Sequence, residues 1–420
     1  MRFTVLIGGL AARHDQRRKA GGSGRLVGSA VGAVALAASL LATAPPAGAA
    51  SLAGAARPLT GSGVQSSFGT PAVWNGTDLV TAQFGTNGNL YAYKQAPGAT
   101  SWKKELVVAA GATGSDGFTP YLAATATSVQ IVSEDNQNGT IWFFQQTDGQ
   151  TTWSAPQLVG TVANTELPQI AWTGVPGHAG TNSVITVDDG SGDVLFFYQN
   201  GGSWTEETVA KAPSPYQYYD PAITATDTGI VIVAPSTEGT FQSWYQPYGG
   251  SGWDSDGTMG VTNGRFQSLS VTWDGTNVDV VSAYTSGEVA FLWKSDSAEF
   301  WSDEVLPGPT TAQPVATDPA IAFTGSNLVV TVVQQMTSST ERLDFWWQGS
   351  TLTDFNLEKA ATATSPKAYF APILLSDANS SGEGAIFAQF SANNAKTFGL
   401  DDWTERVGGK AWTKHTVAPA

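Results

Sequence analysis

Short runs of β-branched, aliphatic and aromatic residues alternate along most of the chain with turns rich in Gly, Asn, Asp and Ser. Runs of this length and composition predict strands, and the intervening residues are those that tolerate tight turns. The repeating region shows no 3.6-residue apolar period of the kind that indicates helices. The clearest stretch predicts strands over residues 268–273, 278–283 and 288–293, with Trp301 opening a fourth.

This strand pattern recurs about every 40 to 50 residues. A proline opens most copies, with a serine in its place in one: Pro71, Pro120, Pro168, Pro221, Ser268, Pro319 and Pro372. A bulky ring marks the last turn of each copy: Trp102, Trp153, Trp204, Trp253, Trp301, Phe355 and Trp412. Both markers give seven copies, so the sequence predicts an all-β, seven-bladed β-propeller of four-stranded antiparallel blades over residues 69–418.

Two details of the blades follow from this interpretation. We expect each proline at the first residue of the innermost strand, as in residues 319–323, where its missing N–H does least harm. Adjacent aromatic residues such as Phe143 and Phe144 point to opposite faces of a strand, so each sheet must be covered by neighbours on both sides.

The first 49 residues have the features of a signal peptide. Arg17, Arg18 and other basic residues precede an apolar run at 26–44, and the small residues Ala47-Gly48-Ala49 form a cleavage site. The arginine pair raises twin-arginine export as an alternative, but the residues that follow favour general secretion. We therefore expect a secreted protein with no membrane span in the mature chain, and an N-terminal segment over residues 50–68 that could add a closing strand.

The mature chain is strongly acidic. Residues 1–49 carry six Lys/Arg and one Asp, so their removal changes the formal net charge from −15 to −20. Such a field repels nucleic acid and other polyanions, which excludes nucleic acid as an expected partner. The chain contains no cysteine, so neither disulfides nor thiolate metal sites are expected.

In a four-stranded blade, the turn from the second to the third strand and the connection to the next blade lie at one end of the sheet. Acidic and aromatic residues gather in these connections, and we select six of them as ligand-binding candidates: Asp188, Asp189, Tyr216, Tyr218, Tyr219 and Asp220. Aromatic faces stack on the C–H faces of sugars, while carboxylates accept sugar hydroxyls. The alternative is that the acidic loops solvate the protein and the tyrosines pack over blade seams.

The recurring tryptophans belong to turns at the opposite end of each blade. Trp204 and Trp253 follow Gly/Ser-rich turns and are added to the ligand-binding candidates, because a half-exposed indole in each blade could bind a sugar. A residue that recurs in almost every repeat can equally wedge adjacent sheets together, and the sequence favours that structural role.

Other chemistry has weaker support. The segment Asp189-Gly190-Ser191-Gly192-Asp193 spaces oxygen ligands as a calcium loop does, but it lacks the bidentate Glu, so no cofactor is expected and calcium is a remote alternative. Glu166 and Asp220 could form a glycosidase pair only if they converged. Only His178 and His415 remain in the mature chain, so a Ser/His hydrolase is not expected and no catalytic residue is assigned.

The run Asp318-Pro319-Ala320-Ile321-Ala322, followed by Asn327-Leu328-Val329-Val330, an aromatic strand and Gly-x-Trp turns, resembles the repeats of secreted seven-bladed bacterial propeller lectins, including fucose-binding and tectonin-like ones. The resemblance lies in the repeat pattern and implies sugar binding. The leading hypothesis is a non-enzymatic protein that binds a glycan or cell-surface polysaccharide. The alternatives are a protein-interaction scaffold with a protein partner on its acidic face, and a glycoside hydrolase.

Overall fold

The computed structural model describes residues between Ala72 and Ala418. Residues 1–71 and 419–420 lie outside the described residues, as do the internal positions 76, 86, 97–98, 100, 112–119, 126, 136–137, 164–165, 174–181, 201, 261–265, 285–286, 296–297, 299, 309–314, 324–326, 338–339, 349–350, 352, 365–367, 377–383, 393–396 and 406–412. The predicted signal peptide, the segment 50–68 and Pro71 are among them.

The strands in the described residues form seven four-stranded sheets, and each sheet takes its strands in chain order. The first three sheets contain β1 (Ala72–Trp74), β2 (Leu79–Phe84), β3 (Leu90–Gln95) and β4 (Lys103–Val108); β5 (Tyr121–Ala124), β6 (Ser128–Asp135), β7 (Thr140–Thr147) and β8 (Gln157–Thr161); and β9 (Glu166–Trp172), β10 (Ser183–Asp188), β11 (Val194–Asn200) and β12 (Ser203–Ala210). The next two contain β13 (Ala222–Ala225), β14 (Gly229–Pro235), β15 (Thr240–Pro247) and β16 (Asp254–Gly260); and β17 (Phe266–Trp273), β18 (Asn277–Tyr284), β19 (Val289–Ser295) and β20 (Ser302–Val305). The last two contain β21 (Val315–Phe323), β22 (Leu328–Thr337), β23 (Thr340–Gln348) and β24 (Phe355–Thr364); and β25 (Ala368–Ser376), β26 (Gly384–Ala392), β27 (Thr397–Glu405) and β28 (Thr413–Ala418).

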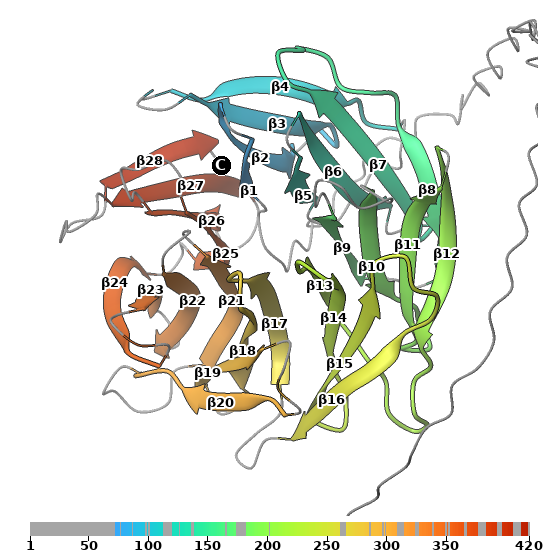
Figure 1. The fold of residues 1–420 in the computed structure, drawn as a ribbon. Coiled ribbons are helices and arrows are strands. Elements are labelled where there is room, and N and C mark those ends of the chain that lie inside the picture. Colours follow the sequence, from blue (N-terminus) through green and yellow to red (C-terminus); the bar gives the residue numbers. More distant parts are fainter. Residues whose placement is uncertain are drawn as a thin grey trace, which may run out of the picture. The chain divides into compact units, whose positions relative to one another are not determined.

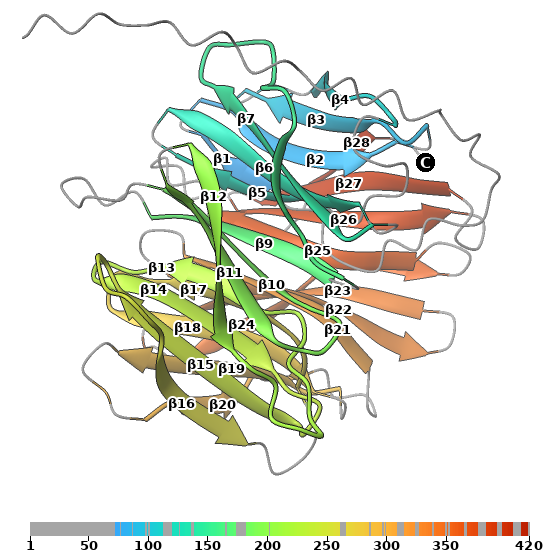
Figure 2. The same ribbon diagram turned by 90° about the vertical axis from the view of Figure 1, so that its right-hand side faces the viewer.

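The first strand of each sheet lies innermost and contacts the first strand of the next. These contacts run from β1 through β5, β9, β13, β17 and β21 to β25, and β25 also contacts β1. Figure 1 shows the sheets following one another around a common axis, and Figure 2 shows them from the side. The predicted all-β propeller of four-stranded antiparallel blades is confirmed. No helix in the described part of the chain is long and apolar enough to cross a bilayer.

The prolines lie at a different place in the inner strands from the one predicted. Pro120 and Pro221 come just before β5 and β13, whereas Pro168, Pro319 and Pro372 lie inside β9, β21 and β25. In each of these three strands the pairing register shifts around the proline, so that two residues face one on the neighbouring strand. A β-bulge leaves one residue without a ladder hydrogen bond, and a residue that lacks an N–H fits there. The expectation that proline marks the first strand residue was therefore wrong for these three sheets.

Both faces of the central strands are buried, as the paired aromatics predicted. Phe144 packs in a cluster with residues of the first sheet, and its neighbour Phe143 packs with residues of the third. Phe196 and Phe197 divide in the same way between the fourth and second sheets. All four rings are almost fully buried, so the core consists of apolar seams between neighbouring sheets.

Candidate functional site

Three segments meet at one end of the third and fourth sheets, and two of them contain predicted ligand-binding residues. They are the β10–β11 turn (188–193), the connection from β12 to β13 (211–221) and the β14–β15 turn (236–239), together called the loop surface. The Tyr218 N–H donates to the Gly192 carbonyl at 3.2 Å, and the Thr237 N–H donates to the Gln217 carbonyl at 2.8 Å. The Gln217 N–H donates in turn to the Thr237 hydroxyl at 2.9 Å. The connection is thus held between the two turns.

Glycine is required where this connection crosses the first turn. Gly192 has a φ of +82°, a left-handed conformation that side chains with a Cβ rarely adopt. A Cβ at Gly192 would also lie 2.5 Å from the Cβ of Gln217. Close approach of the two backbones therefore depends on this residue.

The carboxylate of Asp189 stabilises its own turn. Its Oδ1 accepts hydrogen bonds from the Ser191 N–H at 2.9 Å, the Ser191 hydroxyl at 2.7 Å and the Asp193 N–H at 2.9 Å. Asp193 Oδ1 accepts from the Ala212 N–H at 2.8 Å and so ties the turn to the connection. These contacts are those of an Asx turn, and no group of three or more His, Cys, Asp or Glu side chains that could hold a metal ion occurs among the described residues. Asp188, at the end of β10, is 7% exposed.

The tyrosines of the connection differ in exposure. Tyr216 is 38% exposed, whereas the ring of Tyr218 packs edge-on against Trp244 with ring centres 4.9 Å apart. Burial raises the pKa of Tyr218, and the nearby Glu238 carboxylate adds to the effect. Tyr219 is partly buried, and its N–H donates to the carbonyl at the end of β14. Tyr216 therefore offers the most accessible aromatic ring of the three.

Asp220 and Glu166 are the two carboxylates of the alternative glycosidase pair. Asp220 is partly buried and has a φ of 44°, in the left-handed region that non-glycine residues seldom occupy. Glu166 pairs through its backbone with Asp188 in the β9–β10 ladder, and its side chain lies outside the described residues. The glycosidase pair, which requires the two carboxylates to converge, stays the less favoured hypothesis.

Trp204 and Trp253 lie away from the loop surface, at the opposite end of their sheets. Trp204 packs edge-on against Phe143 of the preceding sheet, with ring centres 5.2 Å apart, and Trp253 packs in the same way against Phe196 at 5.0 Å. Their indole nitrogens are buried. This geometry favours the structural alternative, in which the recurring ring wedges two sheets together.

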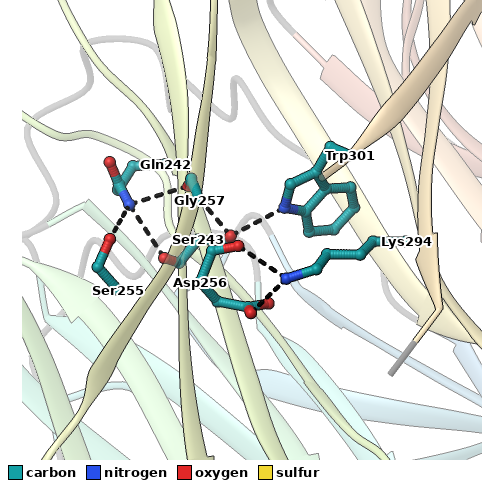
Figure 3. Close-up of polar contacts among 7 residues, drawn as sticks. All are labelled: Gln242, Ser243, Ser255, Asp256, Gly257, Lys294 and Trp301. Atoms are coloured by element: carbon teal, nitrogen blue, oxygen red, sulfur yellow. Dashed lines mark hydrogen bonds and ion pairs between the residues drawn. The ribbon is translucent and has the colours of Figure 1, made fainter. Parts of the chain in front are cut away.

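Trp301 shows the same wedge with an added polar contact (Figure 3). Its ring lies edge-on to Phe241, with centres 5.0 Å apart, and its N–H donates to the Ser243 hydroxyl at 3.0 Å. The Ser243 hydroxyl donates to the Gly257 carbonyl at 3.2 Å, next to a register shift between β15 and β16. A Cβ on Gly257 would lie 3.3 Å from the Trp301 ring, so the indole fits closely over the bulge.

A polar contact beside this wedge recurs in other seams and was not predicted. Lys294 on β19 donates to the carboxylate and, at 3.0 Å, to the carbonyl of Asp256 on the preceding sheet (Figure 3). At the corresponding position of the second sheet, Gln146 donates to Glu105 of the first sheet at 3.1 Å. The sequence signal is a Lys or Gln near the end of the third strand in the first six sheets, but its partner lies in another repeat.

Comparisons with known proteins indicate the fold. No protein-family model matches the sequence, and no curated protein matches it. Among solved structures, the BP39L lectin from Burkholderia pseudomallei has 11% identity and a TM-score of 0.61, over 84% of this chain and 99% of that one. The fucose-specific lectin from Aleuria aurantia has 13% identity and a TM-score of 0.49, over 72% of this chain and 97% of that one. The likeness to the Burkholderia lectin is a likeness of fold.

Proposed function

We propose that the protein is a secreted, non-enzymatic, carbohydrate-binding propeller that binds a glycan at the loop surface. One observation carries the proposal: the connection 211–221 is held between two hydrogen-bonded turns while the ring of Tyr216 stays 38% exposed. An accessible ring beside polar turns suits a neutral, hydroxyl-rich ligand, because the ring covers sugar C–H groups and polar atoms meet the hydroxyls.

The fixed backbone of the loop surface supports this function energetically. Ordering a free side chain or loop on binding costs about 0.5–1.5 kcal/mol for each immobilised side chain. Here the hydrogen bonds at Gly192, Gln217 and Thr237 fix the connection before any ligand arrives. The surface can therefore bind a small sugar without first ordering its backbone.

The fold likeness adds a weaker argument. The Burkholderia protein is named a lectin, and a shared fold raises the expectation of a shared kind of ligand without identifying it. At 11% identity, no sugar specificity is carried over to this chain.

We also propose a ring of seven blades, one for each four-stranded sheet, closed between the last sheet and the first. The contact between β25 and β1 supports closure without a shared blade. Export through the signal peptide at 1–49 belongs to the same proposal and rests on the sequence.

A glycan array probed with the mature protein tests the function, with Tyr216→Ala and Phe300→Ala measured in parallel. Phe300 is 74% exposed and lies in the connection between β19 and β20 of the fifth sheet, so its replacement is a matched loss of an exposed aromatic ring elsewhere. We expect glycan binding by the parent protein and by Phe300→Ala, and a loss of about tenfold for Tyr216→Ala, the size of one aromatic contact with a sugar.

Three outcomes would contradict the proposal or part of it. Absence of any glycan binding, with and without calcium, would exclude the lectin function. Equal losses in the two variants would remove the loop surface as the site. Capture of a basic protein in place of a glycan, with affinity falling steeply as salt rises, would favour the protein-interaction alternative.

A further inference from the structure

A second polar cluster lies on the first sheet, away from the loop surface. It consists of Asn87 and Asn89 in the β2–β3 turn, Tyr91 on β3 and Lys104 on β4. Both Asn side chains donate from Nδ2 to the Tyr91 hydroxyl oxygen, each at 2.9 Å. The ammonium of Lys104 lies 3.7 Å from the centre of the Tyr91 ring.

The orientations of both amides are fixed by other hydrogen bonds. Asn87 Oδ1 accepts from the Asn89 N–H at 3.2 Å, and Asn89 Oδ1 accepts from the Ala110 N–H at 2.7 Å. The NH₂ group of each amide must therefore face Tyr91. Because the phenol oxygen accepts two hydrogen bonds, its own hydrogen is directed to a third group outside the cluster.

Most of the hydrogen-bonding capacity that the cluster offers to a ligand is donor capacity. The carbonyl oxygens of Asn87 and Asn89 each already accept a backbone N–H, and the oxygen of Tyr91 accepts two amide N–H groups. The O–H of Tyr91, the second N–H of each amide and the ammonium of Lys104 remain. An ammonium has no acceptor, and no carboxylate in the described part of the chain pairs with Lys104.

The ammonium of Lys104 gives the cluster a positive charge in a protein that is otherwise acidic. Lys94 and Lys103 share the single carboxylate of Glu105, at 3.3 Å and 2.7 Å. Lys104 pairs in register with Tyr93 and lies over the rings of Tyr91 and Tyr93, on the opposite face of the strand from Lys103 and Glu105, so the carboxylate of Glu105 does not pair with its charge. The field of the distant acidic residues is screened beyond about 8 Å at physiological ionic strength, so the local charge decides what binds.

We propose that Tyr91, Lys104 and the two asparagines form a binding site for an anionic group on a sugar, a carboxylate or a sulfate ester. Such a group accepts hydrogen bonds without donating any, which matches the set of donors. The lowered pKa of Tyr91, caused by the hydrogen bonds from Asn87 and then Asn89 and by the charge of Lys104, agrees with a phenol that donates readily. This site is independent of the loop surface.

Calorimetric titration of the mature protein with galacturonate, galactose 6-sulfate and neutral galactose tests the proposal. We expect at least one of the two anionic sugars to bind about tenfold more tightly than galactose, as one charge-assisted hydrogen bond provides. Binding of galacturonate alone or of the sulfate alone identifies the anion. Equal affinities for all three sugars, or no binding of either anion, would overturn the site.

Two variants separate ligand binding from support of the turn. Tyr91→Phe keeps the ring and removes the O–H, and Lys104→Gln leaves the hydrogen bonds of Asn87 and Asn89 intact. Each is expected to weaken binding of the anionic sugar by about tenfold. Tyr216→Ala, which tests the loop surface, should leave this binding unchanged. If both variants keep the parent affinity while far-UV circular dichroism shows the native fold, the cluster only stabilises its turn and the proposal fails.

Discussion

Replacing Trp301 with Phe should destabilise the protein more than replacing Trp253 with Phe. Both substitutions keep an aromatic ring edge-on to a phenylalanine of the preceding sheet and remove a similar area of indole. Trp301→Phe also loses the hydrogen bond to Ser243, a net loss of about 1 kcal/mol. The Trp253 N–H is buried with no acceptor among the described residues, and burying such a donor costs about 1–3 kcal/mol. Its removal offsets part of the lost packing, so the two variants should differ by about 2 kcal/mol or more.

Urea denaturation followed by far-UV circular dichroism measures this difference, because tryptophan fluorescence changes with the substitutions themselves. The midpoint and the slope are both needed, since a changed slope would indicate that the sheets no longer unfold together. Ser243→Ala is the control. It keeps the indole of Trp301 and removes the acceptor of its N–H, so it should lower the free energy of unfolding by about 1–3 kcal/mol. Equal losses for the two tryptophan variants, with no cost for Ser243→Ala, would refute the role assigned to this hydrogen bond.

Three further predictions concern buried charges and a turn. Burial raises the pKa of Asp279 to about 9, so the folded state retains a proton that the unfolded chain releases near pH 4. The free energy of unfolding should therefore fall as pH rises from about 4 to 9. Asp279→Asn should abolish this pH dependence, which urea titrations across that range measure. Burial also raises the pKa of Asp344 to about 6, against the opposing effect of Arg342. Arg342→Gln should therefore lower the free energy of unfolding by about 3–5 kcal/mol at pH 8, where it breaks a buried ion pair, and by less at pH 5, where Asp344 is protonated. Equal losses of unfolding free energy at the two pH values would contradict the pairing. Gly192→Ala should displace Gln217 and weaken glycan binding at the loop surface, while leaving binding at the Tyr91 cluster unchanged in the same assays.

The strand pattern could be predicted from the sequence because alternating burial and turn chemistry are local properties. The predicted strand 278–283 corresponds to β18 (Asn277–Tyr284), with an error of one residue at each end. The inner strand predicted at 319–323 begins earlier, at Val315, because Pro319 lies in a bulge. Whether a proline starts a strand or lies within it depends on the register of the neighbouring strand, which local composition does not determine.

The role of the recurring rings could not be decided from the sequence. A Gly/Ser turn followed by Trp253 is compatible with an exposed sugar platform and with a buried wedge. The deciding contact is with Phe196, which belongs to the preceding repeat. The Tyr91 cluster, by contrast, has a local signal: Asn87 and Asn89 belong to the turn that leads into β3, so the chain itself brings them close to Tyr91 near the start of that strand.

The two ends of each sheet have different physical roles, and this difference explains where binding is proposed. At the end where the third strand turns into the fourth, Trp204, Trp253 and Trp301 pack between neighbouring sheets, so substitutions there act first on stability. At the other end, hydrogen bonds between backbone and turns fix the loops and leave Tyr216 and the Tyr91 hydroxyl accessible. Side chains that do not hold the sheets together are free to vary with the ligand, so ligand specificity in this fold should depend on the second end.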